Sequence, residues 1–154
     1  MAEPYVGDLG IAMQFVQSWL GGSSPTFAAM GGSSSSIIMG EWPGGTPPAT
    51  TQAFLFPEPG DWDRVQPEVF LGQCQVHVDI LSSPTGLNPQ DAFARVLGQM
   101  WNLRVDLAAA AIAANCNQLR RIACSSAPIR LEPTAAKAAW WQMSLSLVFL
   151  SGNC

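Results

Sequence analysis

The sequence predicts a single α+β domain with an antiparallel sheet of about four main strands and two helices packed on one face of the sheet. Three observations lead to this prediction. A segment in mid-chain alternates apolar and polar residues, as a strand with one wet face does, and sheets with a wet face are more often antiparallel than parallel. Two other segments repeat apolar residues at helical spacing. The length of 154 residues fits one domain, spanning 1–154.

The first element is expected to be a helix from about Asp8 to Leu20. Asp8 is a suitable N-cap, and the glycine pair at 21–22 is expected to end the helix. Apolar residues recur along it at helical spacing, which indicates a face packed on the core: Leu9, Met13, Val16 and Leu20.

An irregular segment is expected from about 21 to 66, where Gly, Ser and Pro are frequent. Two short pieces within it are expected to be strands, Ile37 to Met39 and Gln52 to Phe56. Compact domains rarely hold this much irregular chain unless it has a use. Its aromatic residues are costly to leave in water, so they either pack over the domain's own core or bury against neighbouring subunits: Trp42, Phe54, Phe56 and Trp62.

The clearest strand is expected from Val69 to Leu81, because apolar and polar residues alternate there with a period of two. A long helix follows from Asn88 to about Ala114, with Asn88 as N-cap and Pro89 at its first position. The apolar stripe expected to pack on the core consists of Phe93, Val96, Leu97, Met100, Leu107 and Ala111.

The last third of the chain is expected to form two or three strands. Leu119 to Cys124 and Ile129 to Leu131 are separated by a Ser-Ser-Ala-Pro turn, and the final strand runs from Trp140 to Leu150. These strands complete the predicted antiparallel sheet.

Charge is the first unusual property of the composition. Only 12% of the residues are charged, whereas soluble domains carry about 25%. A subunit that covers much of its surface with neighbours needs fewer charges than a monomer does. The net charge of −4 argues against nonspecific binding to nucleic acid. Arg120, Arg121 and Arg130 are too few for a nucleic-acid site and are expected at strand ends or in ion pairs between subunits.

The sequence lacks a recognisable catalytic or metal-binding motif. His77 is the only histidine, and no G-x-S-x-G nucleophile motif is present. His77 and Asp79 can pair on one face of their strand, an arrangement that is more often structural than catalytic. The four cysteines lack zinc-site spacing and are expected to be free thiols. Glu58, Asp61 and Asp63 are expected to form a solvated acidic loop. We therefore expect no enzyme activity, no metal and no cofactor.

The order of elements resembles a known family. A helix with a Gly-rich break and a Pro-rich segment with short strands come first. The strand "CQVHVDILSS", the helix "NPQDAFARVLGQMWNLRVDLAA" and the closing strands "LRRIACSSAPIRLEP" and "WWQMSLSLVFL" follow. Over about residues 8–150 this order is similar to that of tail-terminator and tail-completion proteins of long-tailed bacteriophages, which join head and tail.

The resemblance implies a structural virion subunit, assembled in the host cytoplasm, that closes into a ring, commonly of six copies. Such a ring caps the tail tube, meets the head connector and leaves a lumen for DNA. Its partners are other copies of itself, the tube protein and neck proteins, with no membrane and no sequence-specific nucleic acid. The interface residues expected are Trp42, Phe54, Phe56, Trp62, Arg120, Arg121 and Arg130.

Other functions stay open. The chain can be a different neck or connector adaptor, since such proteins are also small and form rings. A capsid decoration protein is a further possibility, given the Ser-rich and Pro-rich loops. A small-molecule-binding or enzymatic domain is a third, and it requires a pocket beside His77 on the polar sheet face.

Overall fold

The computed structural model describes residues 8–58, 62–66, 69–84, 86–131 and 140–150, and the side chains of 8, 9 and 58–74 lie outside this description. The first half contains α1 (Asp8–Ser23), α2 (Pro25–Ala29), a 3-10 turn η1 (Ser34–Ser36), β1 (Ile37–Met39), β2 (Gln52–Glu58) and β3 (Trp62–Gln66). The second half contains β4 (Val69–Ser82), α3 (Pro89–Ala113), β5 (Leu119–Cys124), β6 (Ile129–Leu131) and β7 (Trp140–Leu150).

One sheet has the strand order β1-β2-β4-β7-β5, while β6 pairs with β7, and β3 pairs with β4. The pairs β2–β4, β4–β7 and β7–β5 are antiparallel, as the sequence predicted. β1 runs parallel to β2, which makes the sheet mixed. The α+β class is confirmed, with one parallel edge strand that alternation alone did not predict.

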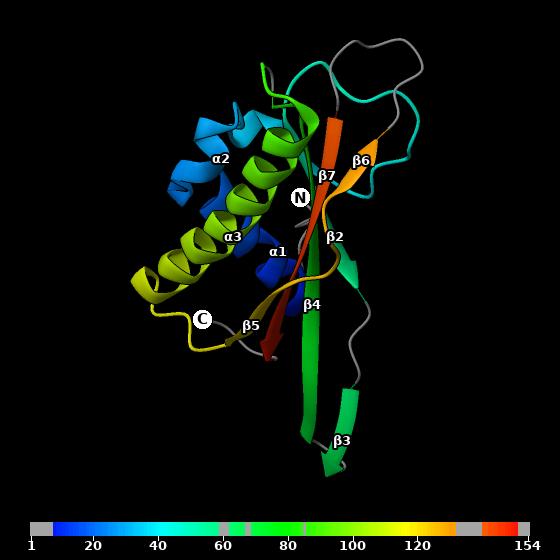
Figure 1. Cartoon of the computed structure of the whole chain (residues 1–154). Helices are drawn as coiled ribbons and strands as arrows, with labels where there is room; N and C mark the ends of the chain where they lie inside the picture. Colours follow the sequence, from blue (N-terminus) through cyan, green and yellow to red (C-terminus); the bar gives the residue numbers. More distant parts are fainter. Residues whose placement is uncertain (1–7, 59–61, 67–68, 85, 132–139, 151–154) are drawn as a thin grey trace.

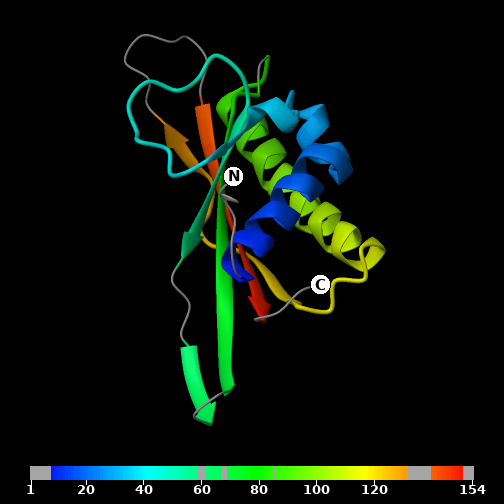
Figure 2. The same cartoon turned by 180° about the vertical axis from the view of Figure 1, so that it is seen from behind.

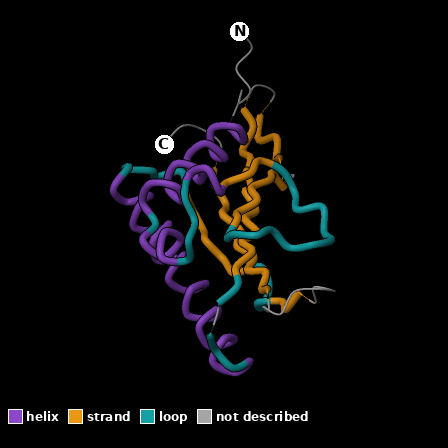
Figure 3. Tube along the Cα trace, turned by 90° about the horizontal axis from the view of Figure 1, so that it is seen from above, coloured by secondary structure: helices purple, strands orange, loops and turns teal. Residues whose placement is uncertain are grey.

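The helices lie on one face of this sheet (Figures 1 and 3). The core fills the space between them, and its residues come from alternate positions of the strands, because successive side chains of a strand point to opposite faces. In β4, Val76, Val78 and Ile80 are fully buried. The partner strand β7 contributes Met143, Leu145, Leu147 and Phe149 to the same core.

The outer face of the sheet carries a smaller apolar cluster. Phe54, Leu81 and Trp140 are buried there, and Trp42 and Leu131 pack against them. The loop that holds Trp42 lies beyond the strands, on the side away from the helices (Figure 3). Phe54 and Trp42, two of the aromatic residues that the sequence placed in the irregular segment, therefore pack on the protein's own sheet.

Helix α2 stands where the sequence predicted irregular chain. Ser24 is its N-cap and accepts a hydrogen bond from the Phe27 N–H, and Pro25 occupies the first turn. The Asp106 carboxylate of α3 accepts hydrogen bonds from the Ser24 hydroxyl (2.9 Å) and the Thr26 N–H (3.0 Å). Support from a distant residue of the chain explains why local composition did not reveal this helix.

Two further boundaries differ from the prediction. Helix α1 continues to Ser23, so the glycine pair at 21–22 does not end it. Residues 62–66, predicted to be irregular, form β3. Among the residues that the structure describes, 69–72 of β4 pair with β3 alone, since the described pairing with β7 begins at Gln73 and that with β2 at Gln75. We call this two-stranded ribbon of 62–66 and 69–72 the arm, and it projects beyond the body of the protein (Figures 1 and 2).

Candidate functional site

Helix α3 has apolar side chains on two adjoining faces. The first face packs on the sheet and is buried: Ala92, Val96, Met100, Leu103, Leu107, Ala110 and Ala111. The second face is exposed, and we call it the stripe: Phe93, Leu97, Trp101, Val105 and Ile112. Its first four members are spaced by four residues, so they lie one above the other along the helix. Helices α1 and α2 and strands β5 and β7 are the neighbours of α3, and they leave this second face open to water.

The stripe corrects part of the sequence interpretation. Phe93 and Leu97 were expected in the core, but they are 39% and 43% exposed. Trp101 and Ile112 are still more open, at 58% and 77%. The error arose because the apolar arc of α3 is wider than the part of the helix that α1, α2 and the sheet cover. The spacing at 93, 97, 101 and 105 was a signal that could have revealed the stripe.

A groove continues the stripe at the end of α3. It has a volume of about 380 Å³ and lies between the second half of α3 and β5. Ile112 of the stripe lines it, so the stripe and the groove form one surface. The remaining lining residues are Arg104, Ala108, Ala111, Cys116, Leu119, Arg120, Arg121 and Ile122.

Three arginines give this groove a positive charge. Arg120 and Arg121, which the sequence singled out, are exposed on β5, and Arg104 joins them from α3. The Arg104 guanidinium lies 5.2 Å from the centre of the Trp101 ring, a cation–π contact that connects the groove with the stripe. Arginine and tryptophan are enriched in the parts of protein interfaces that contribute most to binding.

Strand β5 is the last strand on its side of the sheet path. Its pairing with β7 shifts register between Leu119 and Arg121. A bulge of this kind and charged side chains both hinder unwanted strand pairing at a sheet edge. The side chains beside this edge, rather than its backbone, are therefore the better candidates for binding a partner.

A polar cluster occupies the middle of the outer sheet face. His77 Nε2 lies 2.9 Å from Asp79 Oδ1, so the same-face pair predicted from the sequence exists. The Ser144 hydroxyl donates a 2.6 Å hydrogen bond to the same carboxylate oxygen. The Phe56 ring lies 4.7 Å from the His77 ring, centre to centre, and covers it.

The ionised form of Asp79 is favoured in this cluster. Burial alone would raise the pKa of Asp79, but hydrogen bonds from His77 and Ser144, the charge of His77 and a hydrogen bond from Gln142 together hold this pKa below its usual range. The cluster thus keeps a carboxylate satisfied on a partly covered sheet face.

The cluster has the residue types of a serine hydrolase triad but not its connectivity. A triad needs a serine hydroxyl on the histidine. In the antiparallel register Ser144 lies opposite Asp79, which explains why its hydroxyl bonds the carboxylate instead. The geometry fits a structural role in the sheet better than nucleophilic catalysis.

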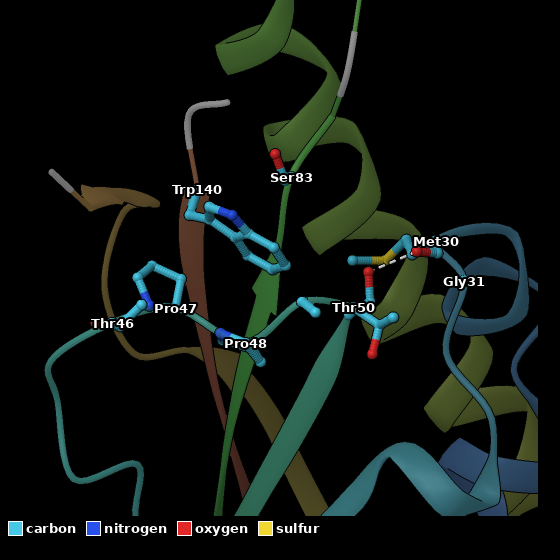
Figure 4. A pocket seen from close by; sticks show the side chains of 10 residues that line it. Met30, Gly31, Thr46, Pro47, Pro48, Thr50, Ser83 and Trp140 are labelled. Atoms are coloured by element: carbon cyan, nitrogen blue, oxygen red, sulfur yellow. Dashed lines mark hydrogen bonds between the residues drawn. The ribbon is translucent and has the colours of Figure 1, made fainter. Parts of the chain in front are cut away.

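A hollow of about 540 Å³ opens near one end of the sheet (Figure 4). Trp140 and Ser83 line one side of it and Pro47 and Pro48 another, while the Thr51 hydroxyl donates a 2.6 Å hydrogen bond to the Met30 carbonyl beside it. Its full lining is Met30, Gly31, Thr46, Pro47, Pro48, Ala49, Thr50, Thr51, Ser83 and Trp140. These residues include no acid, base or histidine, so the hollow offers no group for acid–base chemistry. His77 lines neither this hollow nor the groove.

The remaining predicted interface residues lie apart from the groove. Phe54 is only 5% exposed, and Trp42 and Phe56 are half-buried on the outer sheet face. Arg130 is exposed on β6, opposite Trp141 in the strand register. Trp62 belongs to the arm, and its side chain lies outside the described residues. The structure thus brings Arg120 and Arg121 together with Arg104, and Trp42 together with Phe54.

One expectation about the cysteines was wrong. Cys116, which lines the groove, is disulfide-bonded rather than a free thiol. Cys124, at the end of β5, is a free and exposed thiol as expected. The spacing of the cysteines along the chain held no signal for this bond.

The described part of the chain holds no metal-binding cluster and no membrane-spanning helix. No three histidine, cysteine or acidic side chains lie together there in a way that could hold a metal ion. None of the described helices is both long enough and apolar enough to cross a membrane.

Comparisons with known proteins found a similar structure but no sequence family. No family model matches the chain, and no curated protein sequence matches it. Among solved structures, a chain from the virion of a native gene transfer agent particle has a TM-score of 0.43 and 16% sequence identity, with 94% of this chain and 98% of that chain covered.

Proposed function

We propose that this chain is a structural subunit of a phage-like virion, which forms a ring that caps the tail tube and joins it to the head connector. The observation that carries the proposal is the exposed stripe on α3 with its adjoining arginine groove. A contiguous apolar surface of this kind marks a place where another protein binds. Only 12% of the residues are charged, which agrees with a surface that neighbouring subunits cover.

The order of elements supports the particular kind of subunit. The described chain runs from helix through short strands to a long strand, a long helix and closing strands. This is the order for which the sequence resembles tail-terminator proteins. The tail end of the particle, the ring and the partners in it follow from that resemblance and are part of the proposal.

The two places that could serve as an enzyme site, the His77 cluster and the hollow, lack the arrangement of groups that catalysis needs. The Ser144 hydroxyl bonds Asp79 rather than His77, and the hollow of Figure 4 is lined by neutral residues. The stripe, in contrast, leaves the side chain of Trp101 58% exposed. The geometry therefore supports assembly better than catalysis.

The test is the mass of the purified protein in solution, followed by electron microscopy of the protein and of particles from its producer. We expect a closed ring of several copies and the same protein at the junction of tail and head. A protein that stays monomeric at high concentration and is missing from particles would contradict the proposal.

Binding to purified partners separates the proposed role from its alternatives. A tail terminator binds the end of the tube, an adaptor binds the portal, and a decoration protein binds the capsid in many copies. Each partner is presented to the wild-type protein separately, and the partner retained at the lowest concentration identifies the role.

A further inference from the structure

We propose that the groove between α3 and β5 binds an acidic amphipathic helix of a partner protein, whose carboxylates pair with the three arginines while an apolar side chain enters the groove. This inference rests on the proposed function, in which the chain binds other proteins of the particle, and it states what one of those proteins presents to this surface. The stripe extends the same contact along α3.

A bulge in β5 brings two arginines to the groove. Successive side chains of a regular strand point to opposite faces, so two neighbours do not normally line one cavity. Arg120 and Arg121 nevertheless both line the groove, and both are exposed. The pairing of β5 with β7 steps from Leu119–Phe149 to Arg121–Val148, which leaves Arg120 as the extra residue of the bulge. Because a bulge redirects side chains, the strand presents two cations here instead of one.

The three guanidinium groups have no carboxylate partner in the described part of the chain. Among the described residues, no ion pair or hydrogen bond involves the side chain of Arg104, Arg120 or Arg121, and no acidic side chain lines the groove. Each guanidinium offers N–H donors in a fork that matches a carboxylate. Three such groups in one place, on a chain whose net charge is −4, favour a partner that carries carboxylates.

The lining between the arginines is apolar. The small side chains of Ala108 and Ala111 leave space beside α3, while Leu119 and Ile122 form the wall on the β5 side. Ile112 lines the groove from the stripe and is 77% exposed. An apolar side chain that enters this space leaves water together with Ile112, and such burial is the main favourable contribution to association. The groove thus suits carboxylates and an apolar side chain at once.

This combination fits a protein better than DNA. The groove adjoins Trp101 and the other apolar side chains of the stripe, on which a phosphate backbone has nothing to pack. The net charge of −4 also repels a polyanion as a whole. An amphipathic helix, in contrast, can place apolar residues on the stripe and acidic residues beside the arginines, as helices bound in grooves do.

The test measures binding of two short fluorescent peptides by anisotropy. One peptide has glutamates and leucines at helical spacing, and the other has lysine in place of each glutamate. We expect the wild-type protein to bind the acidic peptide at least about tenfold more tightly, because charge-assisted hydrogen bonds form only with the carboxylates. Arg120→Glu with Arg121→Glu should reverse this preference, and Arg120→Gln with Arg121→Gln should weaken binding of the acidic peptide without creating affinity for the lysine peptide.

The matched control for position is Arg95→Glu. It changes the net charge by the same amount as Arg121→Glu, but Arg95 is exposed on α3 and lines neither stripe nor groove. Arg95→Glu should bind the acidic peptide like the wild type, whereas Arg121→Glu should bind it more weakly. Ile112→Ser tests the apolar part and should also weaken binding. Circular dichroism of each variant confirms folding.

The outcomes separate this inference from the proposed function. A wild-type protein that binds both peptides equally, or groove variants that bind the acidic peptide unchanged, overturn the inference. A DNA duplex that binds more tightly than the acidic peptide and is released by the groove variants identifies nucleic acid as the occupant and overturns it too. Self-association that the groove variants lose, without a preference for the acidic peptide, identifies a second copy with the same result. A protein that selects the acidic peptide through the groove but forms no ring supports the inference and contradicts the proposed function.

Discussion

At the scale of the residue, two positions tolerate little change of side chain, Gly32 and Asp79. Gly32 passes directly over the ring of Phe27, which is buried in the core. Asp79 is held on the outer sheet face by His77 and Ser144 from two strands. Both positions lie away from the stripe and groove, so they test the fold without disturbing the proposed contact.

Replacing Gly32 with alanine is expected to destabilise the protein. The new Cβ would lie 2.6 Å from Cε1 of the Phe27 ring, and that ring is only 1% exposed and cannot move away freely. Overpacking of this kind costs about 1–3 kcal/mol, which thermal unfolding would detect as a lower Tm. Gly22→Ala is the control, because no atom lies within 4 Å of its added Cβ. Equal Tm values for the two variants would contradict the prediction.

Replacing Asp79 with asparagine is expected to change the dependence of stability on pH. Because the pKa of Asp79 is lower in the folded protein, the carboxylate contributes its full stability above the unfolded pKa of about 4, and this contribution is lost as the pH falls through the lower folded value. Asp79→Asn should therefore lose about 1–3 kcal/mol at neutral pH through its unsatisfied partners.

Urea unfolding of this variant between pH 7 and pH 2 provides the measurement. The difference in free energy of unfolding between wild type and Asp79→Asn should shrink as the pH falls below about 4. Glu41→Gln, at an exposed position, serves as the control and should follow the wild type. A difference that stays constant down to pH 2 would contradict the assignment.

At the scale of the element, the sequence predicted most strands and both long helices, because each carries its own local signal. Alternation identified β4, and the N-cap Asn88, whose side chain accepts a hydrogen bond from the Asp91 N–H, marked the start of α3. Helix α2 escaped prediction because Asp106, some 80 residues later in the chain, supports its first turn.

The candidate site was only partly predictable. Arg120 and Arg121 stood out by their clustering, but Arg104 joins them only through the packing of α3 beside β5. Periodicity shows that α3 is apolar over a wide arc, yet it does not say which part of the arc faces the sheet. That choice is made by the neighbours of the helix, which is why Phe93 and Leu97, each more than a third exposed, were assigned to the core.

Substitutions on the two faces of α3 are expected to separate association from folding. Trp101→Gln with Val105→Gln should leave the Tm of the monomer nearly unchanged, because surface substitutions rarely alter stability by more than about 0.5 kcal/mol, while self-association is lost. Leu103→Ala, at a fully buried position of the same helix, should cost about 2–5 kcal/mol. Thermal unfolding at low concentration and sedimentation measure the two effects. A stripe variant that unfolds as readily as Leu103→Ala would show that the stripe belongs to the core of the monomer.

At the scale of the whole molecule, the proposed assembly is expected to be coupled to stability. Anything that binds the folded state and not the unfolded state stabilises the fold by mass action. The stripe is the described part of this protein that stands to gain most from a neighbour, since it is an apolar helix face open to water.

The Tm of the wild-type protein is therefore expected to rise with protein concentration. Calorimetry over a hundredfold range of concentration would measure the rise. The stripe variant Trp101→Gln with Val105→Gln should show a Tm that is independent of concentration. A flat profile for the wild type would contradict coupling between ring formation and folding.

Strand β4 has a mechanical consequence of its own. This single strand of 14 residues begins in the arm and ends in the centre of the sheet, where β2 and β7 flank it on both sides. A force that pulls the arm along the strand axis is transmitted to two ladders of hydrogen bonds, which resist it in shear and share the load among many bonds. A partner that grips the arm would then be tethered to a central strand of the sheet, and the connection would carry tension without a hinge.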